Sequence, residues 1–172
     1  MSRLTPGKPV PALSVATTGG GSWTLNATPP ETFTLIEVYR GQHCPRCKTH
    51  LLDLDHKIAR FNERGVDVIA LSTDPQDRAE AAKAEWGLGN LTLGYGLGIE
   101  AARDWGLYIS TAIADKETRQ FSEPGMFLVR PDGTLYSLVI HTTPFHRHHF
   151  ADVLEAVDMI RARNYPPRGD QG

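Results

Sequence analysis

Residues 39–48 read Tyr39-Arg40-Gly41-Gln42-His43-Cys44-Pro45-Arg46-Cys47-Lys48, and they hold both cysteines of the chain. The largely apolar run Phe33 to Tyr39 precedes this stretch, and a helical pattern from Lys48 to Asn62 follows it. Two cysteines with two residues between them, at a junction of strand and helix, are typical of a redox site rather than of a structural one. The stretch therefore predicts where the chemistry of the chain lies.

The start of the helix explains why this spacing suits redox chemistry. The N–H groups of the first turn have no partner within the helix, and the helix dipole places partial positive charge there. A thiolate is favoured over a thiol at this position, and the thiolate is the nucleophile. Pro45 and Arg46 form a tight turn between the two sulfurs. We expect Arg46, Lys48 and a protonated His43 to lower a thiol pKa further.

The elements next to this stretch predict a parallel βαβ unit. Phe33 to Tyr39 reads as a strand covered on both faces, with Glu37 as the exception. Gly65 ends the following helix, and Val66 to Leu71 is a second apolar strand. Because open α/β sheets place their chemistry at the carboxyl ends of the strands, the cysteines are expected just past the end of the first strand.

The other elements follow from turn residues and periodicity. We expect Asp74 and Pro75 to supply a cap and a first-turn proline for a helix from Gln76 to Trp86. Residues Tyr108 to Gln120 show no clear period and are predicted to be a loop. The other predicted elements are an extended arm (Met1 to Val10), a hairpin (Ala12 to Ala16 with Trp23 to Leu25), a short strand (Leu91 to Tyr95), a helix (Ile99 to Leu107), a second hairpin (Met126 to Val129 with Thr134 to His141) and a final helix (Phe150 to Ile160).

Composition excludes several classes of partner. The chain has 172 residues, of which 40% are hydrophobic and 22% charged, and its net charge is −2. These values are ordinary for a globular domain and give no electrostatic footprint for nucleic acid or an acidic membrane. No run reaches the length of a membrane span, and the first residues lack a secretory signal. With only two cysteines, we expect a cytoplasmic protein whose disulfide is transient and catalytic.

The order of elements from Glu31 to Tyr165 resembles the thioredoxin fold. The segment Tyr39 to Cys47 resembles the active site of thioredoxin-like and peroxiredoxin-like proteins of the AhpC/TSA group, and Ser122 to Gly133 resembles their second hairpin. The resemblance implies an α/β protein with three α/β/α layers and a mixed central sheet, in a thioredoxin-like domain at 31–165. Outside it, the turn residues predict an arm and an N-terminal β-hairpin extension at 1–30, and the proline, glycine and charged residues predict a flexible tail at 166–172. Pro124 matches a proline that is cis in the thioredoxin-like members and faces their cysteines.

The resemblance leaves the reaction open. The peroxiredoxin pattern Pro-x-x-x-Thr-x-x-Cys puts Cys47 at the peroxide-attacking position, but Cys44 then replaces the threonine and Arg40 the proline. The thioredoxin pattern matches at both cysteines. Its buried acid falls at Val38, and Glu37 next to it is expected to point to the opposite face of the strand.

The preferred mechanism is disulfide exchange. Cys44 attacks a substrate disulfide and Cys47 resolves the mixed disulfide. His43, Pro45, Arg46, Pro124 and Arg40 are predicted to support the site. One alternative is a thiol-dependent peroxidase in which Cys47 attacks peroxide and Cys44 resolves, and another is a non-catalytic binding or redox-sensing module. The expected partners are a protein or small-molecule thiol reductant and a disulfide or peroxide substrate, without a cofactor. A homodimer stays open.

A zinc site built on the two cysteines is a further alternative. His141, His146, His148 or His149 could complete four ligands. We expect no metal, because these histidines lie about a hundred residues away and the cysteine pair is not repeated. For Glu37, an ion pair with a nearby basic residue is preferred over a role as a perturbed acid of the site.

Overall fold

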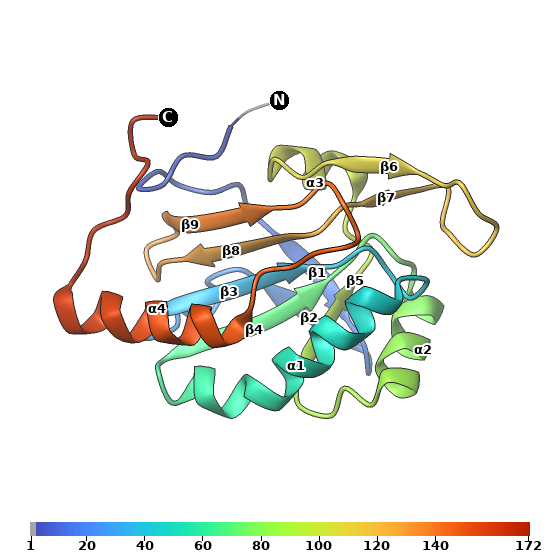
Figure 1. Cartoon of the computed structure of the whole chain (residues 1–172), viewed down its shortest axis with the longest axis horizontal. Coiled ribbons are helices and arrows are strands. Elements are labelled where there is room, and N and C mark those ends of the chain that lie inside the picture. Colours follow the sequence, from blue (N-terminus) through green and yellow to red (C-terminus); the bar gives the residue numbers. More distant parts are fainter. Residues whose placement is uncertain (1–2) are drawn as a thin grey trace.

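The computed structural model describes residues 3–172, and its centre is a mixed sheet in the order β2-β1-β5-β4-β3-β8-β9. Within it β3, β4 and β5 are parallel, whereas β8 and β9 continue the sheet antiparallel on one side and β1 and β2 on the other (Figure 1). A second sheet of two strands pairs β6 with β7. The strands are β1 (Ser14–Thr17), β2 (Gly21–Thr24), β3 (Phe33–Val38), β4 (Val66–Leu71), β5 (Thr92–Tyr95), β6 (Ile109–Thr111), β7 (Gln120–Ser122), β8 (Gly125–Val129) and β9 (Leu135–Ile140).

Helices cover both faces of the large sheet. They are α1 (Pro45–Asn62), α2 (Gln76–Trp86), α3 (Ile99–Asp104) and α4 (Phe150–Arg163). One apolar cluster joins α1, α2 and α4 to the sheet and includes Leu51, Trp86 and Leu154. The other cluster lies on the opposite face, where α3 packs. The result is three layers, which is the predicted thioredoxin-like fold (Figure 1).

The central strand β3 sets the position of the cysteines. All six of its residues are buried, as expected of a strand covered on both faces. Successive side chains alternate, so that Phe33 and Leu35 join one cluster while Ile36 and Val38 join the other. The chain then passes from Val38 through a short loop into α1, which places both cysteines at the carboxyl end of the strand.

The N-terminal segment extends the sheet and covers one of its edges. The predicted hairpin is confirmed, because β1 pairs with β2 and also with β5. Before it, the Gly7 N–H donates to Leu135 O and the Val10 N–H donates to Gly133 O. The proposed division into 1–30, 31–165 and 166–172 stays a prediction. Among the described residues, no helix combines the length and the apolar character needed to cross a bilayer.

The sequence predicted most elements but missed one hairpin. Residues Tyr108 to Gln120 were expected to form a loop, yet β6 and β7 pair there in an antiparallel ladder. The predicted cap of α2 is also wrong. Pro75 itself occupies the N-cap position, and no side chain caps the helix with a hydrogen bond. Helix α3 ends at Asp104, three residues before the predicted end.

Candidate active site

The first turn of α1 brings the two cysteines together. Cys44 is the N-cap residue, and its sulfur accepts the Cys47 backbone N–H at 3.4 Å. Pro45 follows in the first turn, where its missing N–H costs no hydrogen bond. Both cysteines are free thiols, and each is only 1% exposed. A single helix start therefore presents one sulfur to the N–H groups and holds the second one turn further.

An acidic side chain holds the loop before Cys44. The Gln42 backbone N–H donates to the buried Asp74 carboxylate at 2.7 Å. Gly41 has a φ of +140°, and a Cβ added there would lie 2.7 Å from Asp74 Oδ1. Only glycine satisfies both conditions at this position. Asp74 thus positions the loop that leads into the helix, while its other oxygen, Oδ1, pairs with Arg78 Nε of α2 at 3.3 Å.

Cys44 is the more acidic of the two thiols. Its pKa is lowered to about 6, first by a hydrogen bond from the Cys47 thiol and then by the Cys47 backbone N–H and by Arg40, against the opposing effect of burial. Arg40 is held beside it by Glu123, whose Oε2 lies 3.1 Å from Arg40 Nε, and by the ring of Phe121. At neutral pH this sulfur is therefore a thiolate.

Cys47 is held in the opposite state. Burial raises its pKa well above the ordinary value, and the hydrogen bond to Cys44 raises it further. The Arg147 guanidinium partly offsets this effect, because Nη2 lies 3.5 Å from the Cys47 sulfur. The pair therefore has one thiolate and one protonated thiol, each beside its own arginine.

Three predicted supporting residues do not act as expected. The pKa of His43 is lowered to about 4 by burial and by Arg40, so its ring is neutral and supplies no positive charge. That ring packs against Phe121 at 4.8 Å. Arg46 and Lys48 are exposed, and neither is among the main causes of the pKa shift of either thiol. The cations that face the sulfurs are Arg40 and Arg147.

The cis peptide bond that the resemblance implied at Pro124 is not found in residues 3–172. The described residues contain no cis peptide bond, and Pro124 is buried at the start of β8, where its carbonyl accepts the His141 N–H. Its neighbour Glu123 is the residue that serves the site, since it holds Arg40 and accepts the Ser110 hydroxyl at 2.6 Å.

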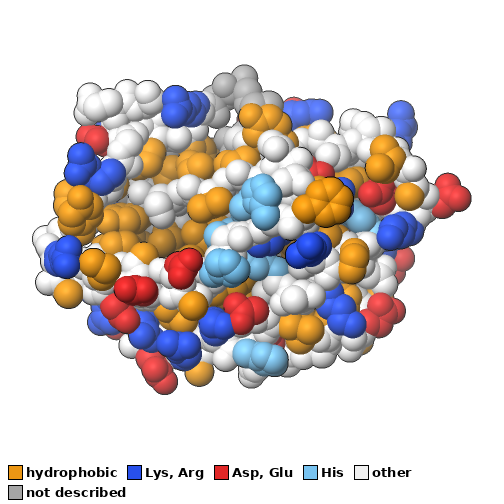
Figure 2. All heavy atoms as spheres, in the orientation of Figure 1, with side chains coloured by type: hydrophobic (Ala, Val, Ile, Leu, Met, Phe, Trp, Pro, Cys, Tyr) orange, Lys and Arg blue, Asp and Glu red, His pale blue; other side chains and the backbone are white. Residues whose placement is uncertain are grey.

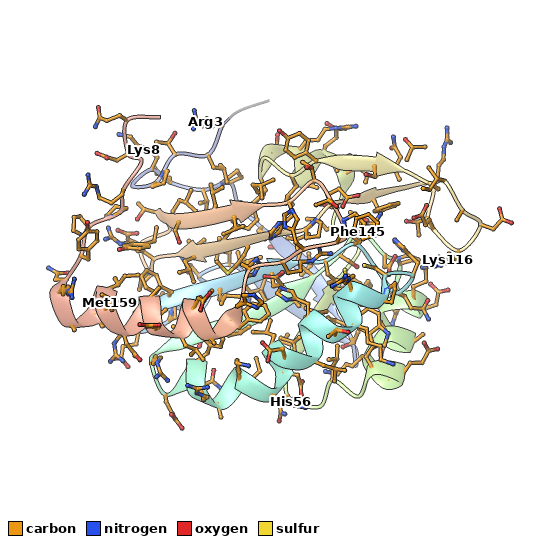
Figure 3. The ribbon with its side chains drawn as sticks, in the orientation of Figure 1. Arg3, Lys8, His56, Lys116, Phe145 and Met159 are labelled. Carbon is orange, nitrogen blue, oxygen red and sulfur yellow. The ribbon has the colours of Figure 1, made fainter. Side chains whose placement is uncertain are left out.

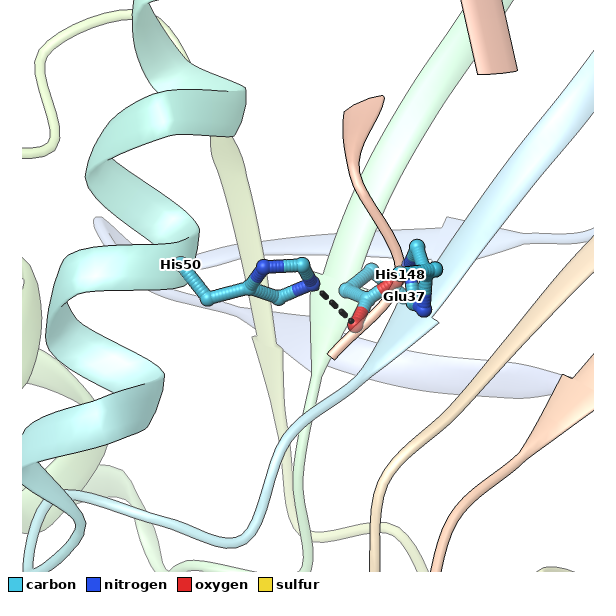
Figure 4. A group of neighbouring side chains, drawn as sticks. All are labelled: Glu37, His50 and His148. Carbon is cyan, nitrogen blue, oxygen red and sulfur yellow. Dashed lines mark hydrogen bonds and ion pairs between the residues drawn. The ribbon is translucent and has the colours of Figure 1, made fainter. Parts of the chain in front are cut away.

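Glu37 lies in a cluster of histidines on the α1 side of the sheet. Its side chain is buried, with Oε1 3.2 Å from His50 Nε2 and Oε2 3.0 Å from His148 Nε2 (Figure 4). The preferred interpretation of Glu37 as a partner of basic groups thus agrees with these contacts, and the groups are histidines. Nearby histidine and basic side chains gather near the centre of the face shown in Figure 2.

The zinc alternative built on the cysteines finds no support. In residues 3–172, the one set of three side chains with ligand atoms close enough for a metal is Glu37, His50 and His148. Neither cysteine belongs to it. His149 is exposed and caps α4 without a side-chain hydrogen bond.

A cavity of about 520 Å³ opens beside the histidine cluster around Glu37. Arg46, His50, Arg147 and His148 line it, together with the exposed ring of Phe145. Figure 3 labels Phe145 on the segment before α4. Another cavity, of about 540 Å³, is lined by the N-terminal arm, Trp105 and β9. Neither cysteine lines these two cavities, and each is buried, so a substrate reaches the sulfurs only after side chains at the helix start move.

Sequence reasoning missed Arg147 and Glu123. Arg147 lies a hundred residues from Cys47, within the tract that we considered only for its histidines. Glu123 lies within the Ser122 to Gly133 segment, in which the sequence pattern indicated only Pro124 as a site residue. A search for arginines and acids in the segments that the fold returns to the cysteines would have found both.

Comparison with known proteins places these observations in context. The model of the AhpC/TSA family matches residues 6–137. Reduced 2-Cys peroxiredoxin from Plasmodium vivax superposes with a TM-score of 0.78 at 20% identity, covering 94% of this chain and 84% of that chain. A mutant of peroxiredoxin 6 from Arenicola marina gives 0.76 at 18% identity, covering 96% and 81%. Peroxidoxin BcpB from Mycobacterium tuberculosis gives 0.73 at 15% identity, covering 94% and 99%. No curated protein sequence matches the chain.

Proposed function

The chain belongs to the AhpC/TSA family, and from this premise we propose that it is a thiol-dependent redox enzyme that cycles between a dithiol and a Cys44–Cys47 disulfide. The observation that carries the proposal is the state of Cys44. Its sulfur accepts a helix N–H, faces Arg40 and has a pKa of about 6. A thiolate at neutral pH, with a protonated thiol one turn away, suits attack followed by resolution.

The chemistry balances with either class of oxidant. With a disulfide, the Cys44 thiolate forms a mixed disulfide and expels one substrate thiolate, and Cys47 then loses its proton and expels the second. With a peroxide, the O–O bond breaks and an S–O bond forms, which gives a sulfenic acid and an alcohol or water. Cys47 then condenses with the sulfenic acid and releases water. An external thiol donates the two electrons that restore the dithiol.

Arg147 favours a second candidate function. Its guanidinium lies 3.5 Å from the Cys47 sulfur and lowers the pKa of that thiol against the effect of burial. The two thiols share one proton, and when that proton lies on Cys44 instead of Cys47, Cys47 is the thiolate and lies beside this positive charge. This arrangement supports a peroxidase in which Cys47 attacks the peroxide and Cys44 resolves.

The proposal extends to partners and location. The enzyme would take a peroxide or disulfide substrate and a protein or small-molecule thiol as reductant. Two free thiols with a redox role suit a reducing compartment, so we propose a cytoplasmic protein. A non-catalytic binding module, by contrast, would not require a thiol with a lowered pKa.

The experiment that tests the proposal compares oxidants on the reduced protein. The protein is mixed with equal amounts of hydrogen peroxide, an alkyl hydroperoxide or glutathione disulfide, and the products are quenched with acid and mapped by mass spectrometry. We expect rapid loss of two hydrogen atoms and a Cys44–Cys47 peptide link with at least one oxidant. No intramolecular disulfide with any of them would support the non-catalytic module. The fastest oxidant identifies the substrate class.

A further inference from the structure

The Glu37 carboxylate sits in an unusual place for an acid. It lies in the middle of the central sheet on β3, is 0% exposed, and has no lysine or arginine among its ion-pair partners in residues 3–172. Its two partners are imidazoles, one on α1 and one in the segment before α4 (Figure 4). A buried carboxylate is costly unless a positive charge is close to it.

Two atoms of this cluster lack a hydrogen-bond partner. Glu37 Oε1 and His50 Nε2 are both buried and face each other as an ion pair at 3.2 Å, but within residues 3–172 neither atom has a partner with hydrogen-bond geometry. Each therefore keeps a lone pair or proton unused inside the protein. Buried polar atoms in folded proteins nearly always have a partner, so this pair points to a ligand between the groups.

We propose that Glu37, His50 and His148 bind a divalent transition-metal ion, with Zn²⁺ as the ion whose chemistry fits best. The ligand atoms lie within 4.8 Å of one another and present two imidazole nitrogens and one carboxylate oxygen. Zn²⁺ takes this donor set at about 2.0–2.1 Å, so ligands of a tetrahedral site are roughly 3.3 Å apart. The two contacts of Glu37 with the imidazoles, at 3.0 and 3.2 Å, come close to that spacing.

The surroundings orient the ligands as a metal site requires. His148 Nδ1 lies 3.1 Å from His141 Nε2, so that the second nitrogen of the ligand ring has a partner that fixes its tautomer. The His50 ring stacks on Phe150 with centroids 4.3 Å apart. These contacts hold both rings with their Nε2 atoms toward Glu37.

The cavity of about 520 Å³ beside His50 and His148 provides access. An ion can enter from this side, and the position left by three protein ligands is open to water. The site would join three elements far apart in the sequence: β3, α1 and the segment 141–149. Binding to the folded state alone should therefore raise the melting temperature.

The test uses protein in which both cysteines are replaced by serine, so that thiols cannot bind the ion. The histidine tag is removed, the protein is treated with a chelator, and Zn²⁺ is added in a calorimeter. Co²⁺ serves as a spectroscopic probe. We expect one ion per chain, visible ligand-field bands of a four- or five-coordinate Co²⁺, and a higher melting temperature. Glu37→Gln and His148→Ala should each weaken binding more than about 100-fold, since removal of a ligand exceeds the effect of second-sphere changes.

His149→Ala is the matched control, because His149 lines the same cavity but is not in the ligand set. It should bind Zn²⁺ like the parent. The proposal is overturned if Zn²⁺ binds only when the cysteines are present, or if His149→Ala weakens binding as much as His148→Ala does. If Glu37→Gln does not fold, His50→Gln decides: unchanged affinity in that variant also overturns the site.

Discussion

The charge on each sulfur depends on contacts of single residues. Cys44 has the helix N–H, the Cys47 thiol and Arg40 around it, while Cys47 has burial and Arg147. The sequence could indicate the cysteine pair because the motif and the helix start are local features. It could not indicate Arg147 or Glu123, since both reach the site only through tertiary contacts.

The reactivity of Cys44 should follow pH with a midpoint near its pKa of about 6. Below the midpoint the sulfur is protonated, so alkylation by an uncharged reagent should slow about tenfold per pH unit, whereas above it the rate should be level. Arg40→Met should move the midpoint upward by about 1 unit, because an adjacent positive charge favours the thiolate. The rate is measured by mass mapping of the Cys44 peptide. Lys48→Met is the control and should leave the midpoint in place; a parent midpoint near 8.5 would contradict the account.

Arg147→Gln should slow the resolving step. The guanidinium 3.5 Å from Cys47 stabilises the thiolate that Cys47 must form, so its loss should cost about tenfold or more in the rate of disulfide formation. The oxidised Cys44 intermediate should then accumulate and be trapped by a sulfenic-acid reagent. Arg46→Gln removes an exposed arginine of the same helix start and serves as the control. Equal rates in the two variants would exclude this role for Arg147.

At the scale of elements, strand β3 and helix α1 carry the site, and their sequence patterns are strong. The sequence did not predict the β6–β7 hairpin because its two strands have three residues each. Strands this short show no clear alternation of apolar and polar residues. The cap of α2 was wrong for another reason. Asp74 has the right residue type, but the helix begins one residue later, and the Asp74 carboxylate accepts the Gln42 N–H and pairs with Arg78.

A buried acid on helix α1, which the sequence did not single out, holds the loop before β5. The Asp55 carboxylate accepts the N–H groups of Asn90 and Leu91, both at 2.8 Å, and is 3% exposed. Asp55→Ala should lower the free energy of unfolding by about 1–3 kcal/mol, because these N–H groups would lose their acceptor.

Asp53→Ala is the control on the same helix, since Asp53 is about half exposed and its ion-pair partner is Lys57. This variant should lower the free energy of unfolding, measured by urea denaturation, by less than about 0.5 kcal/mol. A similar decrease in the free energy of unfolding in both variants would show that the Asp55 hydrogen bonds do not stabilise the loop before β5.

At the scale of the molecule, the two faces of the sheet differ in what covers them, and only one carries the cysteines. One face carries α1, α4 and the cysteines, and the other is covered by α3 and, in part, by the N-terminal arm through Leu4 and Val10. The order of strands and helices was predictable because each long element has a clear period. The path of the arm was not, since its backbone pairing with the start of β9 leaves no pattern in a segment rich in proline and glycine.

Removal of residues 1–10 should destabilise the fold without changing the site. The deletion exposes apolar surface and breaks the arm's hydrogen bonds at Leu135 and Gly133, for an expected loss of about 2 kcal/mol. In a chain of this length the melting temperature should fall by roughly 4–8 °C. The pH profile of Cys44 should stay the same, because the arm packs on the opposite face. A shifted profile would mean that the two faces are coupled.

The order of events at the two sulfurs is tested most directly by single cysteine variants. Reduced Cys47→Ser and Cys44→Ser are each mixed with the fastest oxidant in a rapid-quench instrument, and oxidation of the remaining sulfur is followed by mass spectrometry. Cys44 is expected to react at close to the parent rate in Cys47→Ser and to stop at a trapped intermediate, while Cys44→Ser should react at least about 100-fold more slowly. A Cys44→Ser variant that reacts as fast as the parent would contradict attack by Cys44 and assign the first step to Cys47.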